Sequence, residues 1–294
     1  MPMVKLSRSL LDDNWIGAFR GLCPTPNAPR PWRNGFHGPW MDKVELLPYA
    51  DLLATLNGLA ESMGASTGHG RCLRFVAHDQ CPAQQAYESW IANTGCVPTR
   101  DNLHDRYNAL VWCSAPKTKA RLNQLQSQAI AQQSDRSRRG PLRDATTLWD
   151  ENLLVVVASK DAELCRELLL RHDWDSLFLV HRAHWGSAWR PLVFGHALLE
   201  KLTRPYKAIT AHALVVPSAS ASWPAVDTVL AELAHAQLLP SDFLPIPVMG
   251  IPGWDLANES PGYYRDPLVF RPVRSTLFGK RRQSISRDGP NEWV

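Results

Sequence analysis

The segment from Tyr87 to Asn123 places more constraint on the fold than any other part of the chain. It reads YESWIANTGCVPTRDNLHDRYNALVWCSAPKTKARLN and alternates charged or polar residues with large aromatic ones between stretches of helical character. Burying so many polar groups costs free energy unless each one finds a partner. The segment is therefore predicted to form either a working site or a buried polar network. Its polar members are Arg100, Asn102, His104, Asp105, Asn108 and Lys119.

Composition places the chain among globular proteins. It has 294 residues, of which 45% are hydrophobic and 20% charged, so it can bury a sizeable core. The formal net charge of +4 permits an anionic substrate, but it is weaker than the concentrated basic stripe of most nucleic-acid-binding domains. The six cysteines show neither a CxxC motif nor zinc-finger spacing, which predicts reduced thiols and a cytoplasmic protein.

The sequence predicts no targeting or membrane segment. Residues 1–21 interleave charges with apolar residues and contain no continuous apolar core of a signal peptide. No apolar run reaches the roughly 18 residues that a membrane-spanning helix requires.

Hydrophobic periodicity predicts more helices than strands. Helices are expected over residues 43–63, 82–93, 100–112, 117–133, 161–172, 192–202 and 224–238. Strands are expected over 71–77 and 208–216, and residues 145–158 are expected to form two β-rich runs about a turn at Asp150, Glu151 and Asn152. Because strands and helices do not alternate regularly, a doubly wound parallel sheet is disfavoured.

The expected fold class is α+β: a predominantly helical single domain with a small sheet and long Pro-rich wrapping ends. The domain is predicted to span residues 41–278, after an irregular arm over 1–40 and before a flexible basic tail over 279–294.

Four segments, in this order, carry a resemblance to a known family. They are VPTRDNLHDRYNALVWCSAPKTKARLN, RGPLRDATTLWDEN, FGHALLEKL with PYKAITAH, and PVMGIPGWDLAN with YYRDPLVFRP. Together they resemble the proteobacterial domain of unknown function 3025 over roughly residues 40–275. The resemblance implies no reaction, cofactor or catalytic residue. One departure is Leu153, which follows Asn152 where the family pattern has glycine, so the predicted turn is looser here.

The first constellation that could carry chemistry is His104 with Asp105 and Asn108. On a helix His104 and Asn108 share a face, and Asp105 lies about 100° around the axis. Adjacent His and Asp side chains bind divalent ions in metal phosphohydrolases, although those enzymes need further ligands. The alternative is structural, with Asp105 paired to Arg100 or Arg106 and His104 bonded to a carbonyl group.

The second constellation is His196 with Glu200 in the segment FGHALLEKL. A spacing of four places both side chains on one helical face, where they could hold a metal ion or let the carboxylate orient a histidine base. The segment is not the HExxH zinc motif, because the second histidine is missing. The alternative is a His–Glu hydrogen bond at the rim of the core.

Further acidic and basic groups complete the predicted site. Asp144 is preferred as a metal ligand over Asp150 and Glu151, which are assigned to the turn; the alternative for Asp144 is an ion pair with Arg143. Arg100, Arg139 and Arg143 are predicted to bind an anion, since a guanidinium group binds phosphate with two donors. The alternative is an ordinary solvated face.

These patterns predict an enzyme that hydrolyses a phosphorylated or otherwise anionic substrate with the help of a divalent metal ion. Its metal ligands would be His104, Asp105, Asp144, His196 and Glu200. All of these except Asp144 would also be catalytic residues. The alternatives are a protein that binds nucleic acid or another anionic partner, and a non-catalytic structural or interaction protein. The GxSxG, GxGxxG and GxxxxGK[ST] motifs do not occur, so these nucleophile and nucleotide sites are not predicted.

Overall fold

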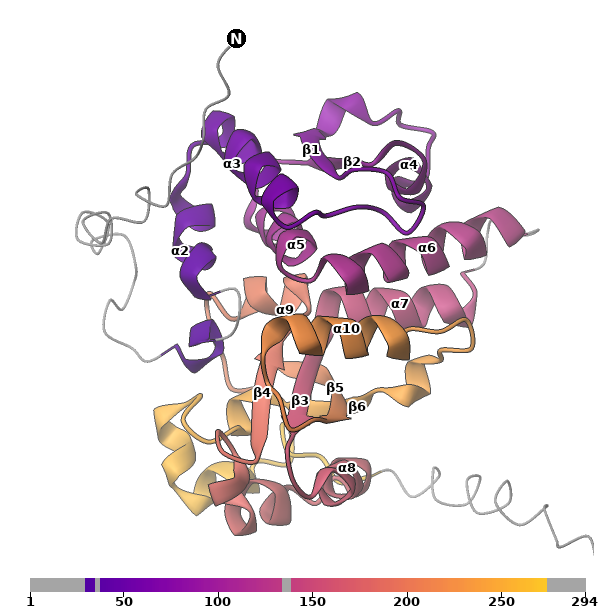
Figure 1. Cartoon of the computed structure of the whole chain (residues 1–294). Helices are drawn as coiled ribbons and strands as arrows, with labels where there is room; N and C mark the ends of the chain where they lie inside the picture. The colour runs from indigo at the N-terminus through magenta and orange to yellow at the C-terminus, as the bar shows by residue number, and fades with distance from the viewer. Residues whose placement is uncertain (1–29, 35–37, 134–138, 274–294) are drawn as a thin grey trace, which may run out of the picture. The chain divides into compact units, whose positions relative to one another are not determined.

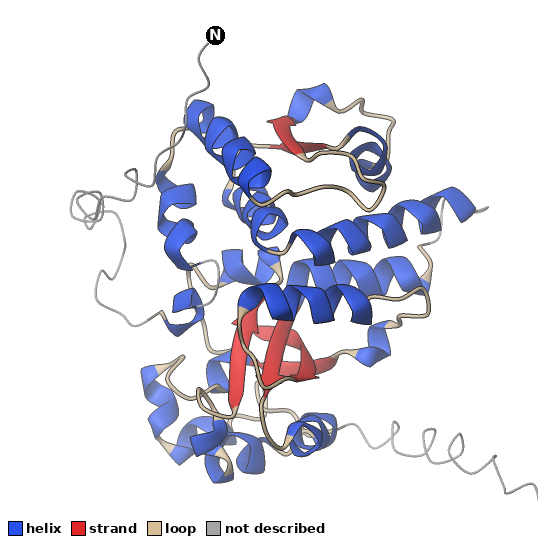
Figure 2. Ribbon diagram, viewed as in Figure 1, coloured by secondary structure: helices blue, strands red, loops and turns tan. Residues whose placement is uncertain are grey.

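The computed structural model describes residues 30–34, 38–133 and 139–273. Helices dominate these residues, and strands are few (Figures 1 and 2). The α-helices are α2 (Gly38–Leu46), α3 (Tyr49–Ser62), α4 (Tyr87–Thr94), α5 (Leu103–Ser114), α6 (Pro116–Gln132), α7 (Pro141–Asn152), α8 (Ala162–Arg171), α9 (His196–Lys201) and α10 (Trp223–Leu233). The structure confirms the predicted class: a predominantly helical α+β domain with small sheets.

The larger sheet has the strand order β4-β3-β5-β6. Its strands are β3 (Leu153–Ala158), β4 (Trp189–Val193), β5 (Thr210–Pro217) and β6 (Leu244–Pro247). Strand β3 pairs parallel with β5 and antiparallel with β4. Every residue of β3 is buried, which explains why this strand reads LLVVVA without polar alternation. A separate parallel pair joins β1 (Arg74–Ala77) and β2 (Cys96–Thr99).

A group of packed helices carries the polar segment singled out in the sequence. Helix α6 packs against α4, α7 and α10, and α5 packs against α9 (Figure 1). Asp227 of α10 fixes the start of α6, because its buried carboxylate accepts hydrogen bonds from the backbone N–H groups of Lys117 and Thr118. A carboxylate at this position satisfies free N–H groups and complements the helix dipole.

The predicted β-turn at Asp150 is wrong, because residues 141–152 form helix α7. Pro141 occupies the first turn, where its missing N–H costs nothing. Ala145, Thr146 and Trp149 then lie on one buried face at helical spacing. Threonine and tryptophan favour strands only weakly, so burial against neighbouring helices decides their conformation here.

Two further boundaries differ from the sequence prediction. The helix expected over residues 192–202 begins only at His196, because Leu192 and Val193 belong to strand β4. The Pro-rich segment after residue 240 contributes β6, a strand with prolines at 245 and 247. Proline lacks a backbone donor and is tolerated at a sheet edge, which is where β6 lies.

The two Pro-rich ends meet in the described part of the chain. Trp32, in the short 3-10 helix Pro31–Asn34, packs on Trp254 with ring centroids 5.7 Å apart. Residues 1–29 and the basic tail over 279–294 lie outside the described residues, so the predicted domain boundaries stay predictions.

Candidate functional site

The polar segment around helix α5 is a buried hydrogen-bond network that reaches the surface at one end. Asn102 caps the helix, since its side-chain oxygen accepts the backbone N–H of Asp105 at 2.8 Å. Asp105, Arg106 and Asn108 are all less than 10% exposed, and each has hydrogen-bond partners. The expected cost of burying these groups is therefore offset by pairing.

The Asp105 side chain binds Arg100, which precedes helix α5. Its carboxylate accepts bonds from the backbone N–H, Nε and Nη2 of Arg100, at 2.7, 3.0 and 3.1 Å. This is the structural alternative considered for Asp105. A carboxylate held by a guanidinium group on two donors is strongly engaged and is not placed as a partner of His104.

His104 and His196 meet although 92 residues separate them in the sequence. Their Nε2 atoms are 3.1 Å apart, and the rings form an edge-to-face pair with centroids 4.5 Å apart. His104 lies in the first turn of α5, and His196 is the first residue of α9. The His104 side chain is 36% exposed, whereas the side chain of His196 is only 5% exposed.

Each histidine is held on its other ring nitrogen by an oxygen atom. Nδ1 of His196 lies 2.8 Å from the backbone oxygen of Asp150, at the C-terminal end of α7. Nδ1 of His104 lies 3.1 Å from Oε2 of Glu200. Glu200 thus orients His104, which belongs to the other helix. The sequence spacing had suggested His196, four residues before Glu200, as its partner.

These oxygen partners determine which ring nitrogens carry protons, assigned here from the heavy-atom network. A carbonyl or carboxylate oxygen only accepts, so Nδ1 of both His104 and His196 must donate. The two Nε2 atoms then face each other, and two lone pairs at 3.1 Å would repel. One further proton between them removes the repulsion. The pair then carries three ring protons and one positive charge, opposite the Glu200 carboxylate.

The buried ring of His196 stays neutral. Burial lowers the pKa of His196 to about 4, and the nearby charges of Lys119 and His104 add to the effect, while Asp150 opposes it. His104 is the more exposed ring, and its Nδ1 lies against the Glu200 carboxylate.

A buried ion pair lies behind His196. Lys119 of α6 pairs with Asp150 of α7, and Nζ of Lys119 also donates to Oδ1 of Asn108 at 2.8 Å. The Asn108 amide in turn donates to the Tyr87 hydroxyl oxygen at 3.1 Å. Burial alone would raise the pKa of Asp150, but Lys119 and His196 outweigh it and the pKa is lowered. Asp150 is therefore an ionised carboxylate inside the protein.

The same network predicts how stability depends on pH. Between about pH 6.5 and about pH 4 the unfolded chain binds a proton at His196 that the folded chain does not. The free energy of unfolding should therefore fall by roughly 2–4 kcal/mol as the pH drops through this range. Urea denaturation at several pH values measures the loss. The variant His196→Gln should show a shallower decline, whereas His69→Gln, at an exposed position, should match the wild type. An unchanged decline in His196→Gln would contradict the prediction.

The remaining predicted site residues are not brought to the histidine pair. Asp144 forms an ion pair with Arg139 at 3.5 Å, and both side chains are 49% exposed. Arg143 donates to the Gln133 side chain at 2.8 Å. Across the described ranges, no group of three or more His, Cys, Asp or Glu side chains could hold a metal ion. The five ligands predicted from sequence are therefore not assembled into one metal site.

Sequence reasoning assigned two site residues to other roles. Asp150 was expected in a turn, and Lys119 was named only as a polar member of the segment Tyr87–Asn123, but both are buried at the α6–α7 contact. Assigning residues 141–152 to a helix would have identified Asp150 as a buried residue. The assignment places Asp150 one turn after Thr146, on the buried face.

No helix in the described part of the chain is long and apolar enough to cross a membrane.

Comparison with known proteins identifies one family. A family model described as "Protein of unknown function (DUF3025)" matches residues 73–274, which include both histidines and the Lys119–Asp150 pair. The resemblance predicted from the four sequence segments is thereby confirmed. No curated protein matches the chain, and no solved structure does.

Proposed function

Because the chain belongs to the DUF3025 family, whose description names no activity, we propose its function from the geometry of the site alone. The chain is an enzyme in which His104 and His196 transfer protons during hydrolysis of an anionic substrate. One observation carries this proposal: the two Nε2 atoms lie 3.1 Å apart while oxygen atoms hold both Nδ1 atoms.

The residues take different roles in this proposal. His104 is the acid–base group, because its ring is partly exposed and the proton between the two Nε2 atoms is the one that it can release to a substrate or to water, while Nδ1 stays bonded to Glu200. Glu200 orients the ring and balances its charge, as the carboxylate does in a catalytic triad. His196 stays neutral and accepts the hydrogen bond from Nε2–H of His104 on the buried side. A positioned general acid or base accelerates a reaction by about 10²–10⁴-fold.

The anionic substrate class rests on charge. An imidazolium at the surface attracts a negative group, and the Arg100 side chain, 55% exposed, precedes the same helix. Asp105 occupies the Nε and Nη2 donors of Arg100, which leaves Nη1 as the donor for a substrate. This charge arrangement favours a phosphate ester, or another substrate that carries a negative group, over a neutral substrate.

The alternative functions predict different results. Binding of nucleic acid requires several cations along one face; Arg139 is paired with Asp144, and Arg100 offers only its Nη1 donor. In a purely structural role the histidine pair would stabilise the contact between α5 and α9 without any activity. The metal-assisted form of hydrolysis would require a bound ion as a further partner of the two Nε2 atoms.

The test combines spectroscopy with activity. Long-range ¹H–¹⁵N spectra should show His196 protonated at Nδ1 and His104 protonated on both nitrogens at neutral pH. The full chain should hydrolyse p-nitrophenyl phosphate faster than the neutral ester p-nitrophenyl acetate, and His104→Gln should lose about 100-fold or more of the activity on the phosphate ester. His69→Gln, an exposed histidine elsewhere, is the matched control.

Three outcomes would overturn the proposal. The first is a neutral His104 at pH 7 in the spectra. The second is a His104→Gln variant with full activity, and the third is a wild type inactive on both esters. Loss of activity on adding a chelator would instead favour metal-assisted hydrolysis at the same pair.

A further inference from the structure

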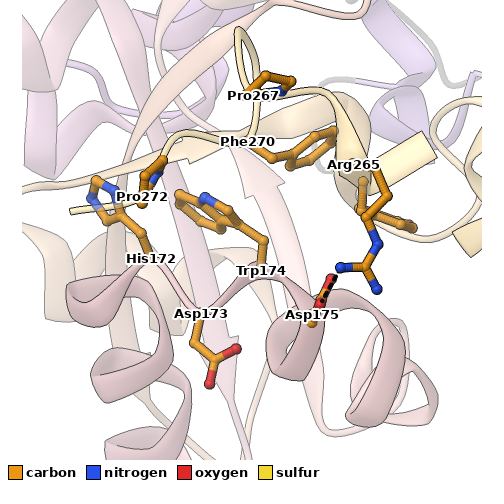
Figure 3. Close-up of a pocket in the computed structure, with 9 residues that line it drawn as sticks. His172, Asp173, Trp174, Asp175, Arg265, Pro267, Phe270 and Pro272 are labelled. Atoms are coloured by element: carbon orange, nitrogen blue, oxygen red, sulfur yellow. Dashed lines mark ion pairs between the residues drawn. The ribbon is translucent and has the colours of Figure 1, made fainter. Parts of the chain in front are cut away.

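A surface cavity of about 300 Å³ lies apart from the histidine pair and shares no residue with it. It is formed where the chain leaves helix α8 and where residues 264–272 pass beside that point (Figure 3). Its volume is at the lower end of the range for small-molecule sites. The residues that matter for recognition are His172, Trp174, Asp175, Tyr264, Arg265 and Phe270.

Rigid aromatic rings make up its wall. Trp174, Tyr264 and Phe270 are each less than 10% exposed. The Trp174 ring lies nearly parallel to the rings of His172 and Phe178, with centroid distances of 4.9 and 6.1 Å. Because Trp174 is only 7% exposed, a ligand would meet the edge of its ring. Such edges carry the positive part of the ring quadrupole and favour the face of another aromatic ring.

Arg265 supplies a directed cation at one end of the cavity. Its Nη1 atom lies 3.2 Å from Oδ2 of Asp175, and the figure shows this pair at the opposite side from His172 (Figure 3). Among the described residues, no partner is present for the Nε and Nη2 atoms of Arg265. That pair of parallel donors matches the two oxygens of a carboxylate.

The two acidic residues of the cavity, Asp173 and Asp175, leave Arg265 able to bind a carboxylate. Asp175 is paired with Arg265 and so holds the guanidinium group in place. Asp173 accepts the backbone N–H of Ser176 at 3.1 Å, and its side chain points away from the aromatic rings (Figure 3). Asp175 balances the Arg265 charge, so what Arg265 offers a ligand is the pair of donors on Nε and Nη2.

His172 supplies a polar group at the other end. Nδ1 of His172 lies 3.0 Å from the backbone oxygen of Arg271, which also accepts Nε1–H of Trp174 at 2.8 Å. Because that oxygen only accepts, Nδ1 donates, and the tautomer that this bond selects has Nε2 as an acceptor. The residue adopts a left-handed conformation with φ +52°, which costs free energy in any residue but glycine.

We propose that this cavity binds a small aromatic carboxylic acid. The carboxylate would lie on Nε and Nη2 of Arg265, and the ring would pack against the edges of Trp174 and Phe270. A hydroxyl or N–H group at the far end of the ligand would donate to Nε2 of His172. This site is independent of the proposed acid–base activity.

Isothermal titration of the full chain with three probes of one shape tests the charge preference. The probes are 4-hydroxybenzoate, the neutral 4-hydroxybenzamide and the cationic 4-hydroxybenzamidine. We expect a Kd below about 1 mM for the acid and at least tenfold weaker binding for the other two. Tighter binding of the amidine, or no binding of the acid at about 10 mM, would overturn the proposal.

Two variants and a control locate the ligand. Arg265→Gln should weaken 4-hydroxybenzoate at least tenfold. His172→Gly retains the left-handed backbone and should abolish the preference for 4-hydroxybenzoate over benzoate. Arg171→Gln removes the same charge from an adjacent exposed residue that pairs with Glu167, and should bind as the wild type does. Equal affinity in Arg265→Gln and the wild type would refute the assignment. Circular dichroism confirms that each variant is folded.

Discussion

The variant Lys119→Met should lose about 3–5 kcal/mol of its free energy of unfolding. Lys119 is 3% exposed and pairs with Asp150, whose side chain is also largely buried. Removing the ammonium group leaves an ionised carboxylate inside the protein without a counter-ion, and deprives Asn108 of a donor. An uncompensated buried charge costs far more than a lost surface contact.

Urea denaturation of three variants checks this expectation. Lys117→Met, two residues earlier on α6, removes an exposed lysine that donates to the Thr228 hydroxyl, and should change stability by no more than about 0.5 kcal/mol. The double variant Lys119→Met with Asp150→Asn should recover part of the loss, because the unpaired charge is gone. A Lys119→Met variant within about 1 kcal/mol of the wild type would show that the ion pair is not buried as described.

The second large effect is expected from Gly195→Ala. Gly195 precedes His196, and a Cβ atom there would lie 2.4 Å from the backbone oxygen of Glu151 and 2.5 Å from the backbone nitrogen of Asn152. Backbone atoms cannot move aside as a flexible side chain can. The start of α9 must then shift away from the end of α7, at a cost of about 3 kcal/mol or more.

That shift should also disturb the histidine pair. His196 reaches the Asp150 carbonyl oxygen only because Gly195 lets the two helix ends approach. We expect the His196 Nδ1 proton to exchange faster with solvent in Gly195→Ala, and its ¹⁵N shifts to change. Gly262→Ala is the matched control, since its Cβ would meet only the Ser260 hydroxyl at 3.6 Å. Unaltered stability in Gly195→Ala would contradict the close approach.

Local signals in the sequence were sufficient for several elements. Asparagine is a favoured cap residue, and Asn102 caps α5; proline suits the first turn of a helix, and Pro116 begins α6. Glycine readily adopts the left-handed conformation that ends a helix, and Gly95 has φ +77° after α4. These features depend on neighbouring residues alone, so they can be predicted from the amino-acid sequence.

The sequence also singled out His104 and His196, each from its own helical face. It could not specify what each ring touches, because those partners come from distant segments. Glu200 bonds to His104 across 96 residues, and Asp150 holds His196 across 46. Asp105, adjacent to His104 in sequence, faces Arg100 instead.

The sequence by itself determined the helical character of the chain and its helix caps, and it singled out His104 and His196 as candidate site residues. These features follow from local propensity and spacing. Only the tertiary structure decided that residues 141–152 form a helix and that Asp150 is a buried carboxylate. The physical reason is burial: packing of α7 against α6 overrides weak strand propensity, and it brings Lys119 to Asp150. Burial likewise sets the low pKa of His196, which no local pattern encodes.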